Sequence, residues 1–223
     1  MIRTIKKIIN NNEFLRKLIV PIYKNYFFNS AVYWEKRYKE GGDSGSGAYG
    51  ILAKFKAKHI NDFIKKNNIK NVVELGCGDG ANLKLYKFTN YVGYDVSSTI
   101  IKANKKKFND KNYQFELIKN IDQNKKFELS LSLDVLYHLT EKFVFEEYLD
   151  TLFNISSKYV IIYSSNFDSY DNINAHVRHR NFEYKVPNSF KLINQIPNDF
   201  PSKGIHDPTG KTSVSEFFIY QKI

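Results

Sequence analysis

The sequence predicts an α/β fold in which helices cover both faces of a largely parallel sheet. β-rich segments alternate with helical segments from about residue 51 onward. A run of alternating glycines directly follows the first of these strands, as in sheets that bind ligands at their carboxyl edge. The last two predicted strands are separated by a polar Pro/Gly stretch and no helix, which predicts an antiparallel pair that closes the sheet.

The spacing of apolar residues predicts each element in turn. Residues 1 to about 40 have a helical pattern with a break at Pro21. Further helices are expected at residues 51–67, 81–88, 99–108 and 143–155. Strands are expected at residues 71–75, 91–95, 113–118, 127–133, 159–163, 190–196 and 214–221. Residues 1–50 are interpreted as a helical segment that ends in a mobile glycine-serine loop (41–50), and residues 51–223 as the main domain.

The composition bounds the function classes. The chain of 223 residues has 34 Lys and Arg against 23 Asp and Glu, a net charge of +11. The excess of basic residues either attracts an anionic partner or forms an ordinary solvated surface. Cys77 is the single cysteine, so no disulfide forms within the chain, as expected in a reducing compartment. Since no stretch approaches the ~18 apolar residues of a membrane span, we expect a cytoplasmic protein without stable membrane insertion.

The strongest signal is the segment NVVELGCGDGANL, in which Gly76, Gly78 and Gly80 follow a hydrophobic strand. Glycines at this point let the backbone turn tightly and approach a ligand, and a helix start offers free N–H groups. The next strand ends in Asp95, fifteen residues after Gly80. A carboxylate there can accept hydrogen bonds from a ribose diol, which predicts a nucleoside-containing cofactor.

Two cofactor classes fit this pattern, since residues 76–81 also satisfy the dinucleotide pattern G-x-G-x-x-G/A. Glu74, two residues before the first glycine, can reach the amino-acid end of a cofactor or fix the loop. With the short α/β run and the closing strand pair, it favours S-adenosylmethionine (SAM) over a dinucleotide. A glycine turn without any ligand is the third possibility.

The motifs ELGCGDG, Asp95 and SLSLDVLYHL resemble those of class I SAM-dependent methyltransferases, over roughly residues 50–165. The resemblance implies a Rossmann-like seven-stranded sheet of order 3-2-1-4-5-7-6 with strand 7 antiparallel. It implies a ribose site at Asp95 and Val96 and, from a looser motif, an adenine site around Asn120 and Ile121. The remaining cofactor-binding residues expected in the core are Glu74, Gly76, Cys77 (a small filler), Gly78, Asp79 and Asp134.

The segment from Asp134 to His138 follows the fourth strand and is expected beside the cofactor's methyl group. His138, with Tyr137 and His179, is a candidate for catalysis, since a sugar hydroxyl must lose a proton on methylation. His138 alternatively hydrogen-bonds the acceptor or caps the next helix. The segment lacks an Asn/Asp-Pro-Pro-Tyr motif, which argues against methylation of amino groups on nucleobases.

A cationic cluster follows the fifth strand and predicts an anion site, because arginine binds phosphate through a planar fork. A solvated loop is the alternative interpretation. A metal is not expected, because no carboxylate or cysteine accompanies the histidines at ligand spacing. The substrate-binding candidates of this region are Asn166, His176, Arg178 and Arg180.

The segment before the glycine-serine loop contains Tyr33, Trp34, Arg37 and Tyr38. We expect it to fold over the cofactor as a lid, with Arg37 near the SAM carboxylate and Tyr33 on the substrate side. The alternative for Trp34 and Tyr38, four residues apart, is that they only pack on the core, and the alternative for the more N-terminal helical residues is a membrane-surface helix.

Two longer stretches, from Tyr33 to Asn61 and from Ser164 to Phe182, resemble methyltransferases of bacterial surface-polysaccharide clusters. Those most alike are proposed to O-methylate the phosphoramidate of capsular polysaccharide. The expected function is therefore O-methylation of a small phosphorylated or nucleotide-linked acceptor, with no nucleic-acid partner. The alternatives are a sugar-hydroxyl methyltransferase, an RNA methyltransferase, a SAM-binding protein without catalysis and a dehydrogenase.

Overall fold

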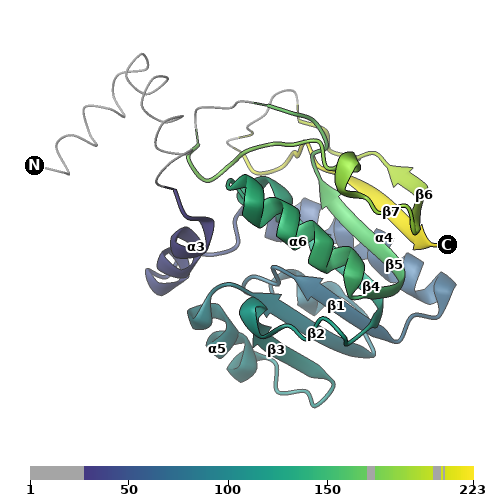
Figure 1. Ribbon diagram of the computed structural model, residues 1–223. Coiled ribbons are helices and arrows are strands. Elements are labelled where there is room, and N and C mark those ends of the chain that lie inside the picture. The colour runs from purple at the N-terminus through teal and green to yellow at the C-terminus, as the bar shows by residue number, and fades with distance from the viewer. Residues whose placement is uncertain (1–27, 170–173, 203–206, 208) are drawn as a thin grey trace, which may run out of the picture.

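The computed structural model describes residues 28–169, 174–202, 207 and 209–223. The helical pattern expected for residues 1–27 lies outside them. Seven strands form one sheet of order β3-β2-β1-β4-β5-β7-β6 (Figure 1). Strands β1 to β5 pair in parallel, and β7 is antiparallel to both β5 and β6, so the predicted sheet is confirmed. The strands are β1 (Asn71–Leu75), β2 (Asn90–Asp95), β3 (Tyr113–Leu117), β4 (Phe127–Leu133), β5 (Ser156–Ser164), β6 (Phe190–Ile196) and β7 (Glu216–Lys222).

Helices cover both faces of this sheet, as Figure 1 shows. The described helices are α3 (Ser30–Lys39), α4 (Gly50–Asn67), α5 (Ser98–Lys107) and α6 (Lys142–Asn154). Apolar residues of α4 and α5, such as Phe55 and Ile101, belong to one core cluster, and Phe145 and Leu149 of α6 belong to the other. The alternation of buried and polar positions along each helix thus gives the sheet two apolar layers.

Polar residues set the beginnings of the two helices nearest the ligand edge of the sheet. The Asn29 side chain accepts a hydrogen bond from the Val32 amide and caps α3. Ser97 does the same for α5 by accepting from the Ile100 amide. Such caps satisfy amides that lack a partner within the helix. The caps fix the first residue of each helix.

The helix predicted at residues 81–88 is wrong in extent, since only the short 3₁₀-helix η2 (Asn82–Leu85) forms. Tyr86 leaves the helical conformation, and its ring packs 5.0 Å from that of Phe88. Phe88 in turn stacks at 5.2 Å on Tyr91 of β2. Burial of these aromatic rings outweighs the local helical preference, since each ring removes a large apolar area from water.

The glycine-serine loop contains a second 3₁₀-helix, η1 (Ser46–Ala48), and hydrogen bonds to the glycine loop after β1. The helices of the described residues include none long and apolar enough to cross a membrane. The predicted division of the chain at residues 50 and 51 stays a prediction.

Candidate active site

The loop after β1 turns sharply at the carboxyl edge of the sheet. Gly76, Gly78 and Gly80 have φ angles of +81°, +54° and +67°, a region that side chains disfavour. The amides of Gly76 and Cys77 both donate to the carbonyl of Tyr94, at 2.7 and 2.9 Å. This shared acceptor holds the loop against the end of β2.

Asp95 ends β2 beneath this loop. Its buried carboxylate accepts hydrogen bonds from the amides of Gly78 at 3.0 Å and Ser97 at 2.9 Å. Burial raises the pKa of Asp95 to about 6, while these amide hydrogen bonds act in the opposite direction. The carboxylate retains acceptor positions, because each of its two oxygens carries two lone pairs.

A hollow opens at the carboxyl ends of β1, β2 and β4, and we call it the cofactor hollow. The name refers to the eight predicted cofactor-binding residues that line it, namely Glu74, Gly76, Cys77, Gly78, Asp79, Asp95, Val96 and Asp134. Residues that the sequence did not single out also line it, among them Lys56, Ile118 and Tyr148. Asn120 and Ile121 are not among its lining residues. Asn120 is exposed and Ile121 packs against the α6 core cluster, whereas Ile118 of the same segment lines the hollow.

Glu74 is buried at the base of the hollow, where the Tyr91 hydroxyl donates to it at 2.6 Å. Burial raises the pKa of Glu74 to about 7, and the Tyr91 hydrogen bond and the Lys56 ammonium partly offset that effect. Glu74 therefore ionises near neutral pH, and its ionised carboxylate attracts a cationic ligand in the hollow.

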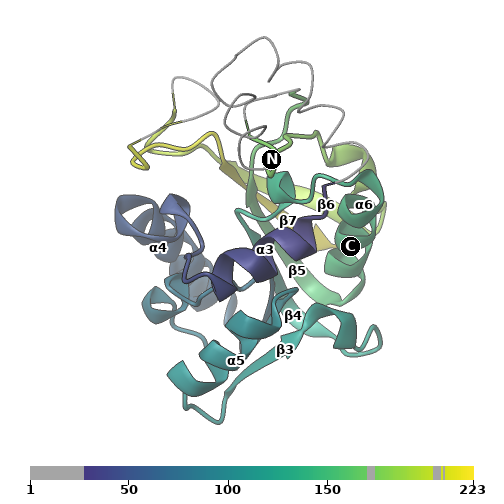
Figure 2. The same ribbon diagram turned by 90° about the vertical axis from the view of Figure 1, so that its left-hand side faces the viewer.

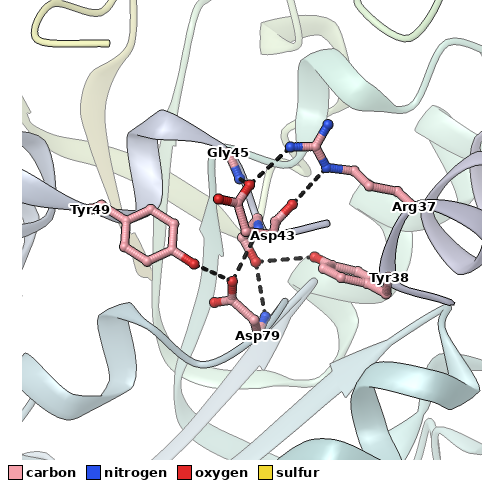
Figure 3. A network of polar contacts seen from close by, with 7 residues as sticks. Arg37, Tyr38, Asp43, Gly45, Tyr49 and Asp79 are labelled. Atoms are coloured by element: carbon pink, nitrogen blue, oxygen red, sulfur yellow. Dashed lines mark hydrogen bonds and ion pairs between the residues drawn. The ribbon is translucent and has the colours of Figure 1, made fainter. Parts of the chain in front are cut away.

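A polar network fastens the glycine-serine loop to the glycine loop (Figure 3). Asp79 accepts from the Ser44 amide at 3.0 Å and from the Tyr49 hydroxyl at 2.5 Å, and its own amide donates to the Ser44 hydroxyl. The Tyr38 hydroxyl lies 3.1 Å from the same Ser44 oxygen. These bonds lower the pKa of Asp79 against the effect of its burial, so this side chain is an anion.

Arg37 binds the same loop and lies outside the cofactor hollow. Its Nε donates to the Asp43 carbonyl at 2.6 Å, and an Nη nitrogen donates to the Asp43 carboxylate at 2.9 Å (Figure 3). The lysine that lines the hollow is Lys56 of α4, whose side chain is 1% exposed. Asp43 thus holds the Arg37 guanidinium at the loop, and the expected place of Arg37 near the SAM carboxylate stays a prediction.

Asp134 stands between two hollows. It has a left-handed backbone with φ of +60°, which is uncommon for a residue with a side chain. One carboxylate oxygen accepts from the Lys56 ammonium at 2.5 Å, and the other accepts from the hydroxyls of Tyr137 at 2.9 Å and Ser215 at 3.2 Å. The ion pair and the two hydroxyls fix the position of the Asp134 carboxylate.

The second hollow adjoins the first and shares Trp34, Ser44, Asp134 and His138 with it. Most of its lining residues are polar or charged. Six serine and threonine residues line it, namely Ser44, Ser46, Ser202, Thr212, Ser213 and Ser215. The charged or titratable lining residues are Arg37, Asp134, Asp207, His138, His176 and His179. Of the predicted catalytic residues, Tyr137, His138 and His179 therefore meet in one hollow.

His138 is set in a defined tautomer. Its Nδ1 lies 3.0 Å from the His176 carbonyl, and since a carbonyl only accepts, Nδ1 carries the hydrogen. The neutral ring then has its lone pair on Nε2. Burial lowers the pKa of His138 to about 4, so the ring is neutral at physiological pH. A neutral imidazole at the junction of two hollows can accept a proton.

The cationic cluster is divided between buried and half-buried positions. Arg180 is buried, and its guanidinium donates to the carbonyls of Leu139 and Thr140, so it braces the segment after β4. Arg178 lies in a third hollow with Lys142, Asp168 and Arg180, and this hollow shares His179 with the second.

The other predicted substrate residues make contacts within the protein. Asn166 donates to Glu183 at 2.9 Å and accepts from the Phe182 amide, so its amide group holds the chain after β5. Tyr33 stacks on His176 with ring centroids 4.8 Å apart. The buried Nδ1 of His179 lies 2.6 Å from the Ser165 hydroxyl. Among the described residues no group of three or more His, Cys, Asp or Glu is arranged to hold a metal ion.

The sequence matches a known protein family. A family described as a methyltransferase domain matches residues 50–201, which is more than half of the chain. The chain belongs to this methyltransferase family. The predicted fold and enzyme class are therefore confirmed, and the dehydrogenase alternative is set aside. No curated protein sequence matches the chain significantly.

Solved structures resemble this methyltransferase in fold. The N-methyltransferase NodS from Bradyrhizobium japonicum WM9, in complex with S-adenosyl-L-homocysteine (SAH), has a TM-score of 0.59 at 13% identity, covering 76% of this chain and 85% of that chain. Magnesium protoporphyrin IX methyltransferase from Synechocystis PCC 6803, with bound SAH, has a TM-score of 0.57 at 13% identity, covering 93% and 100%. A SAM-dependent methyltransferase from Clostridium acetobutylicum ATCC 824 has a TM-score of 0.52 at 15% identity, covering 86% and 97%.

Proposed function

We propose that this methyltransferase binds SAM in the cofactor hollow and transfers its methyl group to a hydroxyl of a small acceptor in the second hollow. The ribose would bind Asp95 and Val96, and the methionine end would lie along the glycine loop near Glu74. The solved relatives with SAM or SAH bound support this choice of donor.

The charges of the cofactor hollow support a cationic ligand. Five acidic residues line it, namely Glu74, Asp79, Asp95, Asp134 and Glu141, together with one lysine, Lys56. SAM carries a sulfonium and an ammonium against one carboxylate, so its net charge is positive. Charges of opposite sign attract most strongly in a site shielded from water, so the acidic lining favours a cationic donor.

The assignment of the acceptor as a hydroxyl rests on His138. A hydroxyl must lose its proton as the methyl group arrives, whereas a phosphate-type oxygen is already anionic and needs cations around it. The junction of the hollows offers a neutral imidazole with an Nε2 lone pair and the carboxylate of Asp134. These groups favour a neutral nucleophile, because Asp134 repels an anionic one.

The wall of the second hollow supports a polyhydroxylated acceptor such as a sugar. Its serine and threonine hydroxyls, Asp207 and the histidines can donate to and accept from many hydroxyls at once. An anionic group on the same acceptor would reach the third hollow, where Arg178 and Lys142 lie beyond His179. A phosphorylated or nucleotide-linked sugar combines both features. Because the third hollow contains these cationic side chains, a phosphoramidate acceptor is the second candidate.

The deciding experiment compares His138→Asn with the parent in a radiolabelled methyl-transfer assay on nucleotide-linked sugars and on their phosphoramidate derivatives. We expect loss of kcat on hydroxyl acceptors by about 100-fold or more, the usual contribution of a general base, with SAH still bound. His59→Asn on α4, outside the hollows described, is the matched control. Full turnover of hydroxyl acceptors by His138→Asn contradicts the proposal, and retained turnover of the phosphoramidate alone selects the second candidate.

Arg178→Ala tests the anionic part of the acceptor. We expect a higher KM for phosphorylated acceptors and an unchanged affinity for SAH, because Arg178 lines the third hollow and not the cofactor hollow. An equal effect on phosphorylated and unphosphorylated acceptors contradicts the assignment of Arg178.

A further inference from the structure

Helix α3 lies across the carboxyl edge of the sheet (Figure 2). Residues on one side of it, including Ser30, Trp34 and Tyr38, line the cofactor hollow. Trp34 also lines the second hollow. A donor that enters the cofactor hollow, and the product that leaves it, therefore pass this helix.

Two contacts hold α3 in this position. The Glu35 carboxylate accepts from the hydroxyls of Ser97 at 2.6 Å and Thr99 at 2.8 Å, at the start of α5. These bonds lower the pKa of Glu35 to about 2, and the α5 dipole favours a negative charge there. At the other end of α3, the Ser30 amide donates to Glu141 at 2.8 Å. Ser97 lies two residues after Asp95, so the first contact adjoins the expected ribose site.

The same helix contacts the His138 ring directly through Trp34 and indirectly through Tyr33. The Trp34 ring meets it edge-on, with centroids 4.9 Å apart and an interplanar angle of 75°. The opposite contact is indirect, since Tyr33 stacks on His176, whose ring lies 5.6 Å from His138 and nearly parallel to it. The His176 carbonyl fixes Nδ1. The orientation of the His138 ring thus depends on α3 through Trp34 and through Tyr33.

We propose that Trp34 is a positioning residue that orients His138, so that the base is assembled only when α3 is closed over the cofactor. This inference rests on the proposed function, in which His138 accepts the proton. An unclosed α3 removes the Trp34 ring from beside His138 and admits water, so that only contacts from outside α3, such as the Tyr137 ring and the His176 carbonyl, still orient the imidazole. Trp34 then couples proton transfer to the enclosure of the cofactor, so that turnover occurs only when α3 covers the cofactor hollow.

The coupling has a signature in the pH profile. Burial is the main cause that keeps the pKa of His138 at about 4, and His176 and Arg37 act in the same direction while Asp134 and the His176 carbonyl oppose it. Removal of the Trp34 ring exposes His138 to water, so its pKa moves up toward the ordinary value of about 6.5. The acidic limb of the kcat profile reports the base in the enzyme–substrate complex and moves the same way.

The test measures kcat against pH at saturating SAM for Trp34→Ala, Trp34→Phe and Val32→Ala. We expect Trp34→Ala to lower kcat about 10-fold or more at pH 7.5 and to move its acidic limb upward by about one pH unit or more. Trp34→Phe keeps an aromatic edge and is expected to restore both. Val32, an exposed residue of the same helix outside the hollows, is the matched control and is expected to behave as the parent.

Glu35→Gln tests the dependence on closure without changing the hollow. We expect faster SAH release in stopped-flow fluorescence and an upward shift of the acidic limb in the same direction. An unmoved limb in both Trp34→Ala and Glu35→Gln, with thermal unfolding close to that of the parent, overturns the proposal. If Trp34→Ala does not fold, Trp34→Phe and Glu35→Gln decide. A fully active His138→Asn enzyme instead overturns the proposed function itself.

Discussion

The buried ion pair between Lys56 and Asp134 gives the sharpest stability prediction. The ammonium and carboxylate lie 2.5 Å apart, and their side chains are 1% and 16% exposed. Lys56→Met keeps the aliphatic stem and removes the charge, which leaves Asp134 with the Tyr137 and Ser215 hydroxyls. Breaking one side of a buried pair costs about 3–5 kcal/mol. With two hydroxyl donors retained, we expect about 3 kcal/mol.

In a domain of this size each kcal/mol lowers the melting temperature by about 2–4 °C, so Lys56→Met is expected to melt about 6–12 °C below the parent, measured by circular dichroism. Lys56→Met/Asp134→Asn removes the stranded charge and should recover part of the loss. Lys158→Met breaks the surface pair with Glu128, at 2.7 Å, and should leave the melting temperature close to that of the parent. A change below about 2 °C in Lys56→Met, or an equal change in Lys158→Met, would refute this reasoning.

Two further predictions concern the donor site, both measured by isothermal titration calorimetry. Asp95→Ala removes the proposed ribose acceptor and should weaken SAM binding by about 10-fold or more, as for a charged hydrogen bond, and an unchanged affinity contradicts the ribose assignment. The affinity of the parent for SAM should rise between about pH 6 and pH 8, because Glu74, with a pKa near 7, ionises over this range and attracts the cationic donor. Glu74→Gln should flatten that rise, and an equal pH dependence in the variant excludes Glu74 as its source.

Local patterns in the sequence predicted the sheet and the glycine loop, because strand periodicity, glycine and a strand-ending acid such as Asp95 act over a few residues. Lys56 could not be predicted in this way. On the helix α4 it reads as one more surface lysine, and only the fold brings it to Asp134, 78 residues later. Arg180 shows the reverse case. Its cationic neighbourhood suggests an anion site, yet its nearest acceptors are the carbonyls after the short 3₁₀-helix η4 (Leu136–His138).

The charge of the chain and the charge of the site have opposite signs, and this contrast bears on turnover. The chain carries a net charge of +11, while acidic residues outnumber lysine in the lining of the cofactor hollow. Methyl transfer converts the sulfonium of SAM into the uncharged thioether of SAH. The ligand therefore loses one positive charge among Asp95, Asp134 and Glu74, and their attraction for it weakens at once. In the proposed function, the carboxylates that favour the donor thus also favour release of the product.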